Sequence, residues 1–158
     1  MDLDDLKNFL QGGNAESLLP SAAQVVETLE LTLRILMMAG PVLMVIMGLV
    51  YLFAAPKEAN YKLGFRCYFG MGSVEAWQFT QRLAGSVWAV LGVILMIAAQ
   101  VVYRQFPALE LMERMWCAVV CVLWQAGLLL LASLIIRIVA ACRFDRHGVR
   151  RAEKRQKQ

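Results

Sequence analysis

The sequence predicts an all-α integral membrane protein with three transmembrane helices and an N-terminal amphipathic helical segment. Its 158 residues are 59% hydrophobic and their mean hydropathy is +0.56, so the chain is more apolar than ordinary soluble domains. The apolar residues gather in three blocks that are bounded by charged residues and contain none. Each block has about the roughly 20 residues that a helix needs to cross hydrocarbon.

The N-terminal segment covers residues 1–34 and shows two helical patterns. The first lies in residues 1–16, where apolar residues recur at helical spacing before Gly12-Gly13-Asn14 breaks it. The second lies in residues 18–34, with Ser17 as a candidate cap and Pro20 in the first turn. Because the chain starts with acidic residues and the first block begins late, we expect no cleaved signal peptide.

The three apolar blocks define the membrane domain, which we place at residues 35–142. The blocks run from Ile35 to Pro56, from Leu83 to Tyr103 and from Met115 to Ile136. The expected spans are therefore about 35–56, 83–103 and 115–137, with a loop at 57–82 and a basic tail at 143–158. A soluble helical bundle is the alternative, but its helices would normally show a polar face, and these blocks are apolar all round.

Several residues inside the spans predict how the helices pack. Gly40-Pro41 marks a possible bend in the first span. A small-residue stripe at Gly85, Ala89 and Gly92 would allow a close approach to another helix. Gln125 lies in the middle of the third span, where we expect it to hydrogen-bond to a neighbouring helix, while a role in a substrate path is the sharper alternative.

The distribution of Lys and Arg predicts the orientation. The N-terminus and the second loop carry four such residues, whereas the first loop and the tail carry eleven, with Arg137 left out at a helix end. Since positive charge collects on the cytoplasmic side, we expect the N-terminus outside and the C-terminus in the cytoplasm. The tail lacks interleaved aromatic residues, so anionic lipid is a better partner for it than nucleic acid, which we do not expect.

The loop at 57–82 is predicted to be folded. Ser73 is a good N-cap for a helix that leads into the second span, and Glu75 lies in the favourable first turn. Gly64, Gly70 and Gly72 permit tight turns and positive φ. The loop is also rich in aromatic residues, which are often simple interface anchors: Tyr61, Phe65, Tyr68, Phe69 and Trp77.

This loop carries a spaced pattern of polar and small residues. It reads Asn60-x-x-x-Gly64-x-Arg66 and is followed by Ser73, Trp77, Arg82 and Gly85. With its order of span, loop and two further spans, the chain resembles the SdpI family of bacterial membrane proteins over roughly residues 35 to 140. It departs from the family pattern at Cys67, where members often have Thr, and at Gln81, where members often have His or Asn.

The resemblance implies a function in immunity to an antimicrobial peptide or toxin, or in relaying a signal by holding a regulator at the membrane. It implies a cell-membrane location and the lipid bilayer, a peptide toxin or a regulator protein as partners. Its motif gives the candidate binding residues Asn60, Gly64, Arg66, Ser73, Trp77 and Arg82. From the residues alone, Arg66 has two readings: it pairs with Glu75 or caps a helix, or it contacts a headgroup, peptide or partner.

The residues give no sign of an enzyme, a cofactor or a metal site. The three blocks contain no Asp, Glu, Lys or His that could form an acid-base pair or a proton relay. Cys117 and Cys121 share a helix face but lack further ligands, so they are expected to be packing residues. Cys67 and Cys142 are expected near or in the cytoplasm, where disulfides are disfavoured. The alternative functions are a small subunit of an oligomeric transporter or channel and a structural accessory of a larger complex.

Overall fold

The computed structural model describes residues 22–56 and 64–152, and within them the chain is built from helices. The elements are α2 (Ala22–Leu49), the π-helix η1 (Val50–Ala54), the 3-10 helix η2 (Phe69–Met71), α3 (Val74–Tyr103), the 3-10 helix η3 (Phe106–Ala108) and α4 (Leu111–Arg143). Three helical stretches are long and apolar enough to cross a membrane: Gln24–Ala54, Val74–Ala108 and Leu111–Arg143. The predicted all-α fold with three spans is confirmed. The helical pattern of residues 1–16 lies outside the described residues, as do the candidate cap Ser17 and first-turn Pro20 of the second pattern and the motif residue Asn60.

The chain divides into two units, residues 1–35 and 36–158. In the first unit, residues 22–35 are the beginning of α2. Its threonines bond back to the preceding turn, Thr28 Oγ1 donating to Gln24 O and Thr32 Oγ1 to Thr28 O, each at 2.8 Å. These bonds satisfy both hydroxyls within the helix. All further contacts described below belong to the second unit.

Small residues set the close contact between the end of α2 and α3. A Cβ at Gly48 would lie 2.6 Å from Ala89 N, and one at Gly92 would lie 2.9 Å from Pro41 O. A Cβ at Gly85 would lie 2.8 Å from Gly48 O. The backbones therefore meet where side chains are missing, as predicted for the stripe at Gly85, Ala89 and Gly92. In lipid, this kind of van der Waals packing drives helix association.

One hydrogen bond ties α4 to α2 in the middle of the apolar helices. Pro41 has no N–H, so it cannot donate to the carbonyl of Met37 one turn earlier. Gln125 Nε2 donates to Met37 O at 2.9 Å instead, and the side chain is only 6% exposed. Gly40 leaves room for this amide, because a Cβ there would lie 2.8 Å from Gln125 Oε1. The expected interhelical hydrogen bond of Gln125 is confirmed, and α2 continues as a helix through Pro41.

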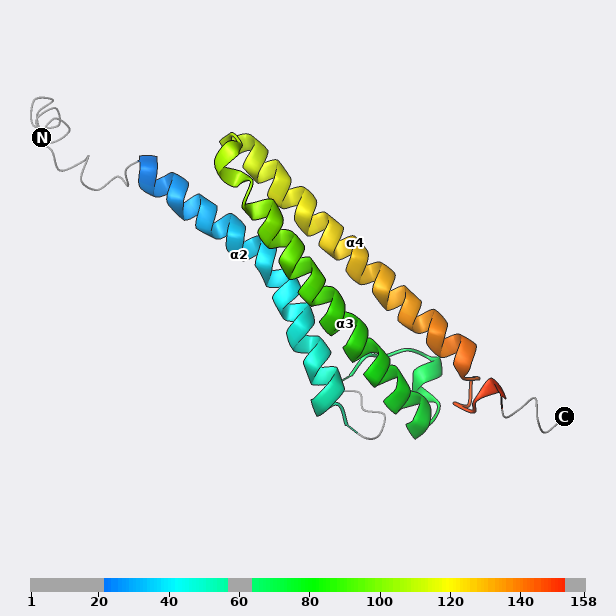
Figure 1. The fold of residues 1–158 in the computed structure, drawn as a ribbon. Coiled ribbons are helices and arrows are strands. Elements are labelled where there is room, and N and C mark those ends of the chain that lie inside the picture. Colours follow the sequence, from blue (N-terminus) through cyan, green and yellow to red (C-terminus); the bar gives the residue numbers. More distant parts are fainter. Residues whose placement is uncertain (1–21, 57–63, 153–158) are drawn as a thin grey trace, which may run out of the picture. The chain divides into compact units, whose positions relative to one another are not determined.

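Helices α3 and α4 run antiparallel beside each other and are joined by a short turn (Figure 1). Within the turn, Phe106 is buried and its ring lies 5.1 Å from that of Tyr103. Glu110 caps α4 in a capping box with Glu113, and Arg114 Nε donates to Leu109 O at 2.8 Å. The turn therefore satisfies its polar groups with neighbours in sequence.

The outward faces of the helices are apolar. Large side chains are widely exposed there, among them Ile97 at 62%, Leu123 at 65% and Leu130 at 72%. Such continuous apolar exposure is rare on soluble monomers. A lipid bilayer, in which these faces need no polar partner, is the environment that the helices fit.

Candidate functional site at the motif end

The candidate site lies at the end of the molecule where α3 begins. We call this region the motif end and define it as residues 51–56, 64–88 and 143–151. Its first element is the start of α3, where Ser73 is the N-cap and its Oγ accepts from Ala76 N at 3.1 Å. Glu75 lies in the first turn. The predicted cap is confirmed, and it fixes where the loop becomes helix.

Trp77 holds the loop to the start of α3. Its side chain is fully buried, and its Nε1 donates to Pro56 O at 2.8 Å. Gly64 lies on its ring with φ +129°, and a Cβ there would come 2.6 Å from the indole. Both the positive φ and the missing side chain are therefore required at this position. Trp77 therefore packs over the loop and ties it to the end of the first span.

Gln81 binds the backbone of the loop with both ends of its amide. Phe65 N donates to Gln81 Oε1 at 2.8 Å, and Gln81 Nε2 donates to Phe65 O at 2.9 Å. Gln81 is 2% exposed and Phe65 8%, so these bonds are shielded from water. Sequence reasoning noted Gln81 only as a departure from the family pattern. A polar residue one turn after Trp77 on the same helix face was the available signal.

Aromatic residues form the core under the loop. The rings of Tyr51 and Trp88 are 5.4 Å apart, and those of Phe65 and Trp88 are 6.0 Å apart and nearly perpendicular. Tyr51, Phe65 and Cys67 belong to one buried cluster with Ala84 of α3 and Ile136 and Ala140 of α4. Of the predicted interface aromatics in the described residues, Phe65 and Trp77 are thus core residues, whereas Tyr68 is 70% exposed.

The first residues after α4 fold back onto the start of α3 (Figure 1). Asp145 builds a tight turn, its carboxylate accepting from the N–H groups of His147 and Val149. Gly148, with φ +72°, brings the turn to the α3 cap, and its carbonyl accepts from Ser73 Oγ at 2.8 Å. Gly72 has an ordinary φ of −74°, so its conformation does not require glycine. The lack of a side chain is required there, because a Cβ would lie 2.6 Å from Gly148 N. Of the three loop glycines that permit positive φ, Gly64 uses it, whereas Gly70 and Gly72 do not.

Most charges of this turn are already engaged. Arg150 forms an ion pair with Glu75, Arg151 Nε donates to Phe144 O at 3.2 Å, and Arg143 lies 4.4 Å above the ring of Phe79. The alternative in which Arg66 pairs with Glu75 is therefore wrong, because Glu75 pairs with Arg150. Arg66 is exposed and makes no ion pair within the described ranges.

A cavity of about 210 Å³ opens between the end of η1 and the first turns of α3. Its polar lining comes from α3, with Arg82 at the rim as an exposed cation, and its apolar wall comes from the residues that end the first span. The lining residues are Tyr51, Leu52, Ala55, Pro56, Gln78, Gln81 and Arg82. This arrangement can hold a small anionic group against an apolar wall.

Most of the predicted site residues lie at the motif end, where some support the fold of the loop and others are exposed. Gly64, Ser73 and Trp77 build the fold of the loop; Trp77 is fully buried, and Gly64 and Ser73 are partly buried. Arg66 and Arg82 are exposed, and Arg82 lines the cavity. Asn60 lies outside the described residues. Gln81 and the turn around Gly148 complete the site and were not predicted.

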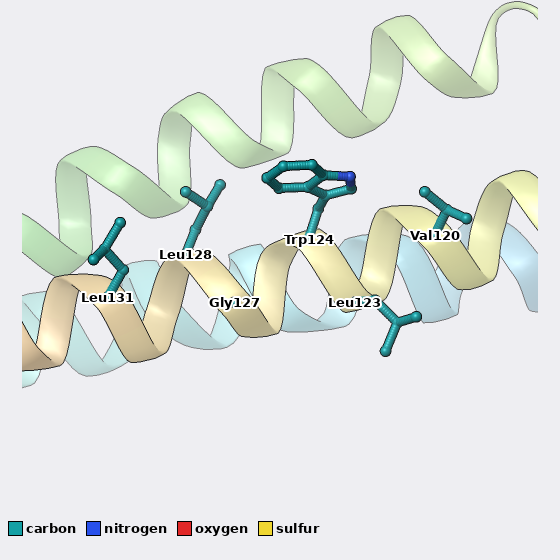
Figure 2. Close-up of a pocket in the computed structure, with 6 residues that line it drawn as sticks. All are labelled: Val120, Leu123, Trp124, Gly127, Leu128 and Leu131. Atoms are coloured by element: carbon teal, nitrogen blue, oxygen red, sulfur yellow. The ribbon is translucent and has the colours of Figure 1, made fainter.

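A second hollow, of about 460 Å³, lies on α4 and has a different character (Figure 2). Trp124 and Leu128 lie on the side of α4 toward α3, and Leu123 points away (Figure 2). Its lining is apolar: Val120, Leu123, Trp124, Gly127, Leu128 and Leu131. In a bilayer this surface meets acyl chains, so we do not place the functional site there.

Comparison with known proteins agrees with the motif. Residues 56–142, more than half of the chain, match the SdpI/YfhL protein family. The matched region contains the loop, α3 and nearly all of α4. Searches of curated proteins and of solved structures found no match.

Proposed function

Because the chain belongs to the SdpI/YfhL protein family, we propose that it is an SdpI-like multi-pass membrane protein that binds a partner at its motif end. This binding confers immunity to an antimicrobial peptide or toxin, or relays a signal to a regulator protein. The chain acts without enzymatic chemistry in this proposal. Its position is the bacterial cytoplasmic membrane, with the N-terminus outside and the motif end and C-terminus in the cytoplasm.

The observation that carries the proposal is the position of Arg66. The loop around it is held by bonds that do not involve its guanidinium: Trp77 to Pro56, Gln81 to Phe65 and Ser73 to Gly148. Arg66 itself is exposed on this rigid support. An exposed arginine that makes no ion pair among the described residues, on a loop held by bonds of other side chains, is suited to recognise a carboxylate or carbonyl groups of a partner.

The test is protection of a sensitive bacterium by the expressed chain. We expect Arg66→Gln to lose most of the protection while its abundance in the membrane stays that of the wild type. Arg104→Gln is the matched control, since Arg104 is an exposed arginine at the opposite end of α3. Protection is measured as survival against a panel of secreted antimicrobial peptides, and abundance by immunoblot of membranes.

Two results would speak against this function. Equal protection by Arg66→Gln and the wild type would remove Arg66 from the site. Absence of protection, together with homo-oligomers in crosslinked native membranes and leakage of small solutes, would favour the channel or transporter subunit instead.

A further inference from the structure

The cavity at the motif end has the chemistry of a phosphate site. We propose that it binds the phosphate group of an anionic lipid, with Arg82 as the cation. The inference rests on the proposed function only because it assigns the cavity to the binding site at the motif end. It adds the chemical class of one ligand of that site. Its support comes from charge, depth in the membrane, and backbone geometry.

Charge favours an anion. The described residues of the motif end contain six arginines and two acidic residues, Glu75 and Asp145. Glu75 is paired with Arg150, and Asp145 accepts bonds within its own turn. No acidic residue is among the described lining residues, and none of these forms an ion pair with Arg82. A guanidinium binds phosphate through two parallel hydrogen bonds, which fix its orientation.

Depth favours a lipid as the source of that phosphate. Arg82 directly precedes the second uncharged block, and Pro56 ends the first one, so the cavity lies where the hydrocarbon-spanning residues stop. Lipid phosphates lie at this level. Leu52, Ala55 and Pro56 give the cavity an apolar wall beside the cation. That wall fits the glycerol and first acyl carbons of a lipid, which a free phosphate ion lacks; basic pockets between transmembrane helices bind headgroups in this way.

The backbone around the cavity gives it pre-formed walls. Residues Val50–Ala54 form a π-helical turn, a local irregularity that often occurs at functional sites. This turn contributes Tyr51 and Leu52 to the lining, and Gly85 lets Leu52 approach α3 closely. On the opposite wall, the Gln81 amide is fixed by its two bonds to Phe65. A pre-formed wall lowers the ordering cost of binding.

The experiment uses the full chain purified in mild detergent. Native mass spectrometry would compare the retention of phosphatidylglycerol and phosphatidylcholine by the wild type, Arg82→Gln, Arg82→Lys and Arg104→Gln. We expect the wild type and Arg104→Gln to retain phosphatidylglycerol over phosphatidylcholine, and Arg82→Gln to bind it roughly ten-fold more weakly. Arg82→Lys should retain phosphatidylglycerol less than the wild type and more than Arg82→Gln, because lysine keeps the charge and lacks the two parallel donors of the guanidinium.

Competition with inorganic phosphate separates the two sources of the group. Displacement of phosphatidylglycerol by millimolar phosphate, and not by chloride at equal ionic strength, would support phosphate recognition. Equal retention by Arg82→Gln and the wild type would overturn the proposal. So would binding of inorganic phosphate without retention of any anionic lipid. Lipid retention is measured on purified protein and protection in cells, so the two proposals can fail separately. Loss of lipid retention can occur while protection through Arg66 persists, and loss of protection can occur while lipid retention persists.

Discussion

The two ends of α3 are held by different kinds of hydrogen bond. At the turn into α4, Leu109 N donates to Phe106 O, Glu110 N to Glu113 Oε2 and Arg114 Nε to Leu109 O, so these bonds join residues three to five apart. At the motif end, the bonds span larger distances in sequence. They join residues 16 apart at Gln81, 21 apart at Trp77 and 75 apart at Ser73.

The difference indicates that the turn into α4 only connects two helices, whereas the motif end is a folded surface. A local turn orders few residues and needs no contact beyond those that make α3 and α4 antiparallel. Ordering a loop and the turn around Gly148 costs conformational entropy that only long-range contacts offset. The motif end therefore depends on a few buried side chains, and the following changes test that dependence from the largest expected effect to the smallest.

Removing Trp77 should have the largest effect. Trp77→Ala leaves a cavity at a fully buried site and removes the bond to Pro56 O, which should cost about 3–5 kcal/mol in the free energy of unfolding. Trp77→Phe keeps most of the packing and should cost clearly less. Trp116→Ala, at a position 65% exposed, is the control. Unfolding in SDS of detergent-purified protein measures all three, and equal losses for Trp77→Ala and Trp116→Ala would contradict the structure.

Gln81→Leu should have the next largest effect. It leaves the buried N–H and C=O of Phe65 without their partner, at a cost of about 2 kcal/mol in the free energy of unfolding. The counterpart at the other end of α3 is Gln105→Leu, an exposed position where a change within about 0.5 kcal/mol is expected. Amide exchange should also become faster at Phe65 in Gln81→Leu. Unchanged exchange there would contradict the two-point bond.

Ser73→Ala should weaken the cap and release the turn after α4 together. Ser73 caps α3 and donates to Gly148 O, so its loss should cost about 1 kcal/mol and make trypsin cleavage after Arg150 faster. Glu110→Ala also removes an N-cap, at the start of α4, but leaves this turn in place. Limited digestion of both variants in detergent compares them. Equal cleavage after Arg150 would argue that the turn is not held by Ser73.

Much of the fold was predictable from the sequence because its causes are local. Uncharged blocks of spanning length predicted the three helices, and Ser73 followed by Glu75 predicted the start of α3. The small-residue stripe and Gln125 predicted helix contacts, since few alternatives exist for such residues in lipid. Gln125 also illustrates the limit: its partner, Met37 O, follows from Pro41 only once the two helices are known to be neighbours.

The candidate site was less predictable because it is assembled from distant parts of the chain. The motif identified Arg66 and Arg82 as candidates, but nothing in their spacing indicated that Glu75 pairs with Arg150. Gln81 was visible as a departure from a family pattern, and its partner, the Phe65 backbone, has no sequence signature. The turn around Gly148 lies in a segment whose composition predicted only a basic tail. Long-range pairing of this kind has to be read from the structure.

The smallest effect should come from the ion pair of Glu75 and Arg150. Both side chains are about half exposed, at 52% and 43%, so solvent screens their attraction and the pair should contribute at most about 1 kcal/mol. A double-mutant cycle with Glu75→Gln and Arg150→Gln measures that coupling, which should shrink at high salt. A coupling above 2 kcal/mol would mean that the pair, and not Ser73, holds the turn to α3. A coupling near zero with Ser73→Ala still releasing the turn would identify the hydrogen bond to Gly148 as the contact on which the arrangement depends.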